Sequence, residues 1–167
     1  MTSHELFAAI PAALAADILD FSHDHDRKLY RAALDAVAQA RKLRSVFLER
    51  QPRAERNGLM AASLGRPALA VAADSLLRNW LLKKHTGILT DFLDALGVKH
   101  ENGVVEELPK TVDDSTLKLA VERLLSKHPP GAVAIYLHAF NSMNAESWAN
   151  LETILKTEPR LALSRGA

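Results

Sequence analysis

Two histidines and two aspartates alternate in the string His23-Asp24-His25-Asp26, a concentrated group of metal-binding residue types. Imidazole and carboxylate groups are ligands for zinc, nickel and iron. Alternate residues point in one direction only in an extended backbone, so His23 and His25 would need a third ligand from elsewhere in the fold. One hypothesis is therefore a metal-dependent protein that uses His23 and His25. The favoured interpretation is a helix start, at which Asp24 or Asp26 accepts backbone N–H groups.

A further histidine, His138, lies in the apolar segment 132–140, which we expect to be buried. A buried imidazole needs a partner for each ring nitrogen, and its pKa shifts when it loses water. Because no nucleophile or acid motif accompanies His138, a satisfied core histidine is favoured over a catalytic base. The chain has no Cys and no Gly-rich phosphate loop. We therefore expect no cofactor, and a non-enzymatic role is favoured over an enzymatic one.

Basic residues cluster in the segment 41–56, in which the only acidic residues are Glu49 and Glu55. The cluster consists of Arg41, Lys42, Arg44, Arg50, Arg53 and Arg56. Arginine side chains suit phosphate and carboxylate groups, so the segment is a candidate site for a polyanion or an acidic partner. The net charge of +1 gives no general attraction to nucleic acid or to an anionic membrane. A solvated helix face, paired with acidic residues elsewhere, is the plainer interpretation.

The elements that position these residues are predicted to be helices. Ala and Leu together supply 54 of the 167 residues, whereas Val, Ile and Thr supply 21. Since Ala and Leu favour helices and β-branched residues favour strands, this ratio predicts an all-α fold. Apolar spacing and the Pro and Gly stops predict about seven or eight helices, arranged as consecutive antiparallel hairpins. The predicted ranges are about 11–21, 26–50, 53–64, 68–84, 88–96, 113–127, 132–141 and 145–156.

The long predicted helix at 26–50 carries much of the basic cluster. Its apolar stripe follows steps of three and four residues, and Pro52 ends it. The break at Pro52 would bring Arg50, Arg53 and Arg56 to one corner. The stripe that we expect to face the core consists of Leu29, Ala33, Ala36, Ala40, Leu43 and Phe47.

Two segments of the second half, 81–96 and 124–140, resemble each other in their helix stops and apolar residues. Their spacing of about 43 residues is the length of a HEAT or armadillo helix pair. The chain is therefore either an irregular HEAT/armadillo-like stack or a set of unrelated helical hairpins. Between the two segments, 98–108 is predicted to form a short hairpin or loop around Asn102-Gly103.

The length of the chain predicts a single helical domain over 1–160 with a frayed tail at 161–167. No apolar run reaches the roughly 18–20 residues that span a bilayer. Residues 6–16 have the length of a signal-peptide core, but residues 1–5 contain no Lys or Arg. A retained helix is therefore favoured over a signal peptide at 1–16, and we expect a cytoplasmic protein that does not bind a membrane.

These patterns do not determine an activity, but they rank three hypotheses. The favoured one is a non-enzymatic helical protein-interaction module, whose interhelical grooves bind an unknown protein partner or an acidic ligand. The second is binding of nucleic acid or another polyanion through 41–56, with nucleic acid the less favoured ligand. The third is the metal-dependent protein that uses His23 and His25. Self-association as a homo-oligomer is left open.

Overall fold

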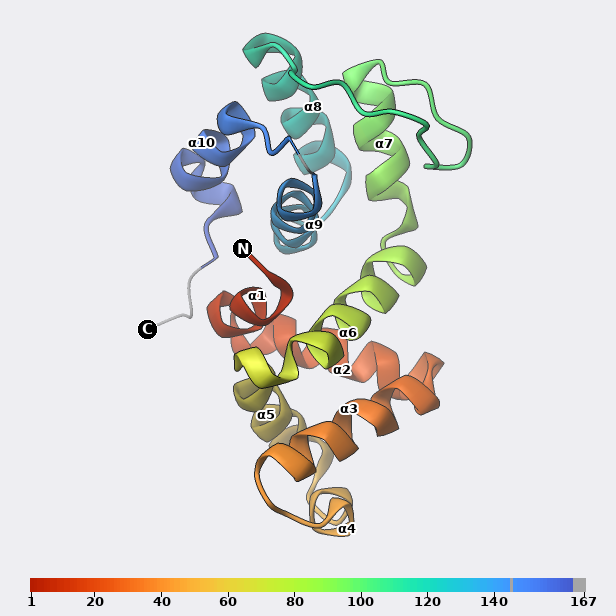
Figure 1. Cartoon of the computed structure of the whole chain (residues 1–167), viewed down its shortest axis with the longest axis vertical. Helices are drawn as coiled ribbons and strands as arrows, with labels where there is room; N and C mark the ends of the chain where they lie inside the picture. Colours follow the sequence, from red (N-terminus) through yellow and green to blue (C-terminus); the bar gives the residue numbers. More distant parts are fainter. Residues whose placement is uncertain (145, 164–167) are drawn as a thin grey trace. The chain divides into compact units, whose positions relative to one another are not determined.

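Every regular element in the computed structural model is a helix, over the described residues 1–144 and 146–163 (Figure 1). The predicted all-α class is confirmed. Contacts group the chain into two compact units, Met1–Lys84, with which Leu163 is grouped, and His85–Ala162. The prediction of one domain over 1–160 concerns independent folding and stays a prediction. None of the described helices has the length and hydropathy of a membrane-spanning segment.

The first unit packs its helices around a core that includes Leu6, Ile18, Leu48 and Trp80. Helix α2 contacts α3, α5 and α6, while α1 contacts α5 and α6. In a solenoid each repeat contacts only its neighbours, so these contacts between distant segments differ from a HEAT-like stack. The elements are α1 (Ser3–Ala9), α2 (Ala12–His25), α3 (Arg27–Ala40), α4 (Ser45–Glu49), α5 (Arg53–Leu64), the 3₁₀ helix η1 (Pro67–Leu69) and α6 (Ala70–Lys83).

The N-terminal segment forms two helices where the sequence predicted one. Ile10, the residue before Pro11, has an extended backbone (φ −74°, ψ 152°), because proline disfavours the helical conformation in the residue that precedes it. Pro11 then precedes the first turn of α2. Leu6, Phe7 and Ile10 before the break and Ile18 after it are buried, so both sides of the break pack into the core.

The predicted helix over 26–50 is wrong, because the chain leaves the helix at Arg41–Leu43 and forms α4 separately. Lys42 adopts the left-handed conformation, with a φ of 56°. The Leu43 N–H donates to the Ala38 carbonyl (2.8 Å) and the Lys42 N–H to the Gln39 carbonyl (3.1 Å), which is a Schellman motif. The two breaks, at Pro11 and at Lys42, raise the helix count from the predicted seven or eight to ten in the described residues.

The apolar stripe of that predicted helix loses its register at the same break. Leu29, Ala33, Ala36 and Ala40 lie on α3, where Ala33 is buried. Leu43 and Phe47 were expected to face the core, yet they are 36% and 52% exposed. The prediction was wrong for these two residues because the turn at Lys42 rotates α4 out of line with α3. It was also wrong for Ala40, which is exposed at the end of α3.

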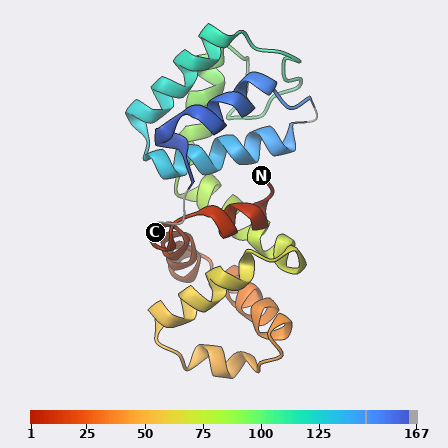
Figure 2. The same cartoon turned by 90° about the vertical axis from the view of Figure 1, so that its left-hand side faces the viewer.

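The second unit is built on α9, which packs against α7, α8 and α10 (Figure 2). The α9 residues Ala132–Leu137 are all buried. Helices α7 and α8 pack against each other, and α10 packs on α9. Phe92, Tyr136, Phe140 and Trp148 form a chain of ring contacts in this core. The elements are α7 (Thr86–Leu96), α8 (Asp114–Lys127), α9 (Pro130–Met143), α10 (Ala149–Thr157) and the 3₁₀ helix η2 (Pro159–Leu161).

A tight turn at Asn102-Gly103 forms the centre of the predicted hairpin or loop near 98–108. Both residues have positive φ, 51° and 86°, and the Glu101 and Val104 backbones exchange two hydrogen bonds of 3.0 Å. Pairing extends no further among the described residues, so the segment is a loop with one isolated bridge. Glycine is favoured at position 103 because the φ of 86° strains any residue with a side chain and because an added Cβ would lie 2.8 Å from Leu89 Cδ2.

The two segments that resemble each other in sequence do not occupy equivalent positions in the structure. The segment 81–96 crosses the boundary between the units at Lys84–His85, whereas 124–140 lies within the second unit. Of the tail predicted at 161–167, Leu161 is fully buried in η2, and 164–167 lie outside the described residues.

Candidate functional site

The structure divides the predicted basic cluster into an outer and an inner group. Lys42, Arg44 and Arg50 are exposed and make no ion pair within the described part of the chain. Arg53 and Arg56 instead reach toward α2 and α3, and Arg41 donates to the Ser63 hydroxyl (3.3 Å). The six residues therefore do not form one continuous basic surface.

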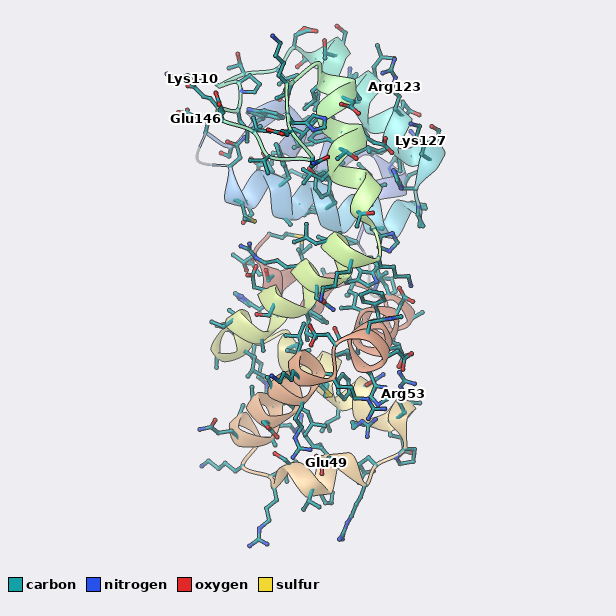
Figure 3. All side chains as sticks on the ribbon, turned by 90° about the vertical axis from the view of Figure 1, so that its right-hand side faces the viewer. Glu49, Arg53, Lys110, Arg123, Lys127 and Glu146 are labelled. Atoms are coloured by element: carbon teal, nitrogen blue, oxygen red, sulfur yellow. The ribbon has the colours of Figure 1, made fainter. Side chains whose placement is uncertain are left out.

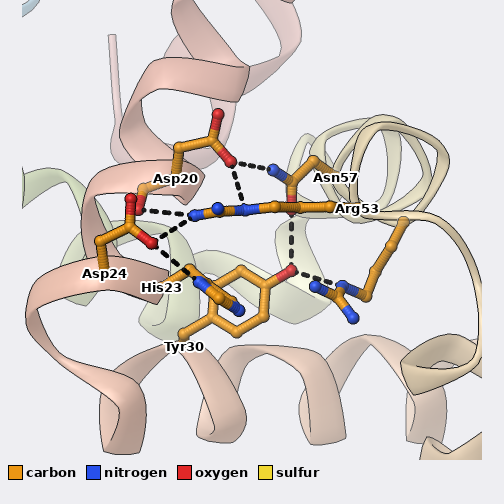
Figure 4. Close-up of polar contacts among 7 residues, drawn as sticks. Asp20, His23, Asp24, Tyr30, Arg53 and Asn57 are labelled. Atoms are coloured by element: carbon orange, nitrogen blue, oxygen red, sulfur yellow. Dashed lines mark hydrogen bonds and ion pairs between the residues drawn. The ribbon is translucent and has the colours of Figure 1, made fainter.

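Arg53, at the start of α5, joins two carboxylates of α2 (Figure 4). Its Nε lies 2.9 Å from Asp20 Oδ1, and its Nη2 donates to Asp24 Oδ1 (2.7 Å) and to the Asp20 carbonyl (3.3 Å). His23 also hydrogen-bonds Asp24, and the His23 and Arg53 bonds hold the pKa of the Asp24 carboxyl below its usual range. Two carboxylates face one guanidinium, so Arg53 has little attraction left for an added anion.

Arg56 belongs to a second polar chain, which links α3, α5 and α2. The Tyr30 hydroxyl accepts from Arg56 Nε and donates to Asn57 Oδ1, both at 2.8 Å. Asn57 Nδ2 donates to Asp20 Oδ1 (2.8 Å), which connects this chain to the Arg53 pair. Burial raises the pKa of Tyr30, so its hydroxyl keeps the proton that it donates. The arrangement fixes three helices and serves structure more than ligand binding.

A groove of about 820 Å³ lies beside this network, between α2 and α5. One end is polar and is formed by Asp20, Arg53 and Asn57. The remaining lining residues are apolar or small: Phe7, Ile10, Ala12, Ala13, Ala15, Ala16, Ala54, Gly58, Ala61 and Ala62.

The walls of the groove are made of residues that project little from the helices. Ala54, Gly58 and Ala62 follow each other at four-residue steps along one face of α5, and Ala12 and Ala16 do so on α2. Ala12, Ala54, Gly58 and Ala62 are exposed, so the groove is open along its length. Small side chains let a third helix approach closely. Such a helix would also remove the exposed apolar atoms from water, which is favourable.

His23 and His25 do not converge on a metal-ligand group. His23 bonds Asp24 (3.0 Å) and stacks edge-on against the Tyr30 ring, whereas the His25 ring lies 4.6 Å from that of Phe21. Across the described residues, no three His, Asp or Glu side chains come together as ligands. The string ends α2, and Asp26 begins α3 by accepting from the Leu29 N–H (3.1 Å).

His138 lies half-buried on α9, and loss of water lowers its pKa to about 4. The imidazole is therefore neutral at pH 7. Within the described residues its ring makes no hydrogen bond to protein, and it belongs to no cluster of titratable groups. The side chain is thus only half-buried, and it is not the buried and satisfied core histidine that the sequence predicts.

The sequence analysis missed two groups of residues that shape these surfaces. One is the series Ala54, Gly58 and Ala62, whose four-residue spacing is visible in the sequence. The other is the exposed apolar trio Leu43, Val46 and Phe47, which lies among the outer basic residues. The trio was not recognised in the sequence because Leu43 and Phe47 continued the apolar stripe of α3, which was expected to face the core.

Comparison with family models, with curated proteins and with solved structures gives no match to this chain.

Proposed function

We propose that the protein is a non-enzymatic helical interaction module that binds an amphipathic helix of a partner protein in the groove between α2 and α5. The observation that carries the proposal is the open apolar groove of about 820 Å³ with small residues on both walls. Recognition of a helix in a groove needs an apolar channel that receives side chains at positions i, i+3 or i+4, and i+7. The fixed polar end at Asp20, Arg53 and Asn57 would set the register of the bound helix.

An enclosed small-molecule pocket is supported less well by the same residues. Such pockets bury 70–90% of the ligand and carry a few convergent polar groups. Here much of both walls is exposed, and the polar groups at the end are already bonded to one another. The exposed wall residues are Ala12, Ala13, Ala54, Gly58 and Ala62. A long ligand that covers the open walls fits this geometry better than a compact one.

The test is selection from a library of displayed peptides of about 20 residues, a length that sustains a helix. We expect the selected peptides to share apolar residues at helical spacing. The double variant Ala54→Leu/Ala62→Leu fills the groove and should weaken their binding about tenfold or more, measured by fluorescence anisotropy.

The matched control is Ala32→Leu/Ala40→Leu, because these two exposed alanines have the same eight-residue spacing on α3, outside the groove. The control should bind the selected peptides as the unchanged protein does. Selection that yields no peptides, or peptides that bind the groove-filled variant equally well, would overturn the proposal.

A further inference from the structure

We propose a second docking surface on the first unit, which binds an acidic amphipathic segment of a protein. This surface, the α4 patch, consists of Lys42, Leu43, Arg44, Val46, Phe47 and Arg50. It shares no residue with the groove and goes beyond the function proposed above.

The apolar part of the α4 patch is a local concentration of exposed hydrophobic side chains. Leu43, Val46 and Phe47 are 36%, 46% and 52% exposed. The other large exposed apolar residues of the described chain are each separated from the next by many positions: Met1, Val71, Leu82, Val104, Leu119 and Met143. Single exposed apolar residues are ordinary, but a group of them marks an interaction surface.

The charged part of the patch consists of cations that are not engaged in ion pairs. Lys42, Arg44 and Arg50 are exposed and form no ion pair among the described residues. Glu49, the acidic residue of α4 (labelled in Figure 3), is paired with Arg31 of α3. Three positive charges without ion-pair partners therefore lie close to the apolar trio along the chain, and a ligand of complementary charge would gain from each of them.

The patch is held in place by contacts on the inner side of α4. Leu48 is fully buried, and the Arg56 Nη1 donates to the Glu49 carbonyl at the end of the helix (3.3 Å). The Schellman motif at Lys42 fixes the other end. A partner would therefore meet a preformed surface, which reduces the ordering cost of binding.

The α4 patch combines positive charge with exposed apolar side chains, and this combination determines which class of ligand fits it. A nucleic-acid backbone would use the three cations and leave the apolar trio uncovered. A bilayer would need side chains that project beyond the charges, whereas these three keep about half or more of their surface against the protein. An acidic helix with one apolar face matches both parts of the patch.

The test uses a labelled peptide of about 20 residues, with Glu on one face and Leu and Phe on the other, in buffer of low ionic strength. We expect saturable binding by fluorescence anisotropy. Phe47→Ala should weaken it about tenfold, and Val46→Ser should have a similar effect. Because both side chains are exposed, these variants should fold, and circular dichroism checks that they do.

The charge requirement is tested by Lys42→Glu/Arg44→Glu/Arg50→Glu, which should abolish binding. The matched control is Arg27→Glu/Lys28→Glu/Arg66→Glu, because these exposed residues of the first unit carry the same charge outside the patch. Val71→Ala is the matched apolar control, since Val71 is 83% exposed and isolated. Both controls should keep most of the affinity.

Three probes separate the alternatives: a Glu peptide whose apolar residues are replaced by Ser, a short DNA duplex, and vesicles rich in phosphatidylserine. Tight binding of the Ser-substituted peptide or of the duplex, with no effect of Phe47→Ala, would overturn the proposal in favour of a polyanion site. Vesicle binding without peptide binding would overturn it in favour of a membrane surface. Absence of all binding, or equal loss in the control variants, would also contradict it. None of these results bears on the groove, which Ala54→Leu/Ala62→Leu tests separately.

Discussion

Arg56 contacts Tyr30 in two ways, through a 2.8 Å hydrogen bond from its Nε to the hydroxyl oxygen and through its guanidinium carbon, 5.5 Å from the ring centroid. The same hydroxyl donates to Asn57, whose side chain is almost fully enclosed at 3% exposure. One phenol therefore satisfies two polar groups of α5 from a position on α3. Both of these hydrogen bonds between α3 and α5 use a single oxygen atom.

Tyr30→Phe should destabilise the first unit by about 1–3 kcal/mol, because it leaves the buried amide oxygen of Asn57 without its donor. Urea denaturation followed by circular dichroism measures the change. Tyr136→Phe is the matched control, since the Tyr136 hydroxyl is buried without a hydrogen-bond partner in the described structure. Its loss should be neutral or stabilising. Equal destabilisation by the two substitutions would show that the hydroxyl of Tyr30 has no special role.

Lys42→Gly should stabilise the protein by up to about 1 kcal/mol, because glycine adopts the left-handed conformation without the steric cost that a Cβ adds. The thermal unfolding midpoint measures this gain. Arg41→Gly is the control one residue earlier, where φ is −92° and glycine relieves nothing. It should destabilise the protein. A lower midpoint for Lys42→Gly would contradict the Schellman geometry at the end of α3.

Gly58→Ala should raise stability by about 0.5–1 kcal/mol, because Gly58 lies within α5 and nothing lies within 4 Å of the added Cβ. The opposite result is expected for Gly103→Ala in the second unit. There the φ of 86° and the contact of 2.8 Å with Leu89 both oppose a side chain, so the loss should exceed about 1 kcal/mol. Both are measured by chemical denaturation. If the two substitutions had the same sign, the local backbone would differ from that described.

Asp91→Asn should destabilise the second unit at pH 7 by about 1 kcal/mol, and the effect should fade at low pH. Asp91 accepts from His128 Nε2 (2.7 Å) and lies near Lys127, and these contacts lower the pKa of its carboxyl. A carboxyl whose pKa is lower in the folded state stabilises the fold above the ordinary pKa of about 4. As the pH falls below about 4 and then through the lower pKa of the folded state, the carboxyl binds a proton and this contribution to stability is lost.

The measurement is the free energy of unfolding of both proteins, the unchanged one and Asp91→Asn, from pH 7 down to pH 3. The control is Asp35→Asn, which removes an exposed ion pair with Arg31 on α3. Exposed pairs of this kind contribute little, so the control should show a small difference at every pH. A difference for Asp91→Asn that stays constant down to pH 3 would exclude the hydrogen bond with His128 as its cause.

Those parts of the fold that depend on strong local signals were predictable from the sequence. Asp113 caps α8 by accepting from the Thr116 N–H, and Gly97 ends α7 with a φ of 72°. The exit from α3 was not predictable, because lysine at position 42 has no preference for the left-handed conformation that it adopts there. The error that followed placed Leu43 and Phe47 in the core.

For the candidate surfaces, the sequence located the basic residues but not their environments. Arg44 and Arg53 are both arginines of the same basic segment. Arg53, however, is paired with two acidic residues of a different helix, Asp20 and Asp24. Pairing across some thirty residues depends on the packing of α2 against α5, which local patterns do not specify. The groove has the same origin, since its walls come from two helices that are distant in the chain.

Trp80 belongs to the first unit and Trp148 to the second, and they are the two tryptophans of the chain. Both are shielded from solvent, at 1% and 3% exposure, so the emission of each should shift to longer wavelength when its surroundings open. Trp80→Phe would leave Trp148 of the second unit as the single tryptophan. Trp148→Phe would leave Trp80 of the first unit. Intrinsic fluorescence of this pair of variants can therefore record which unit opens first, without any added dye.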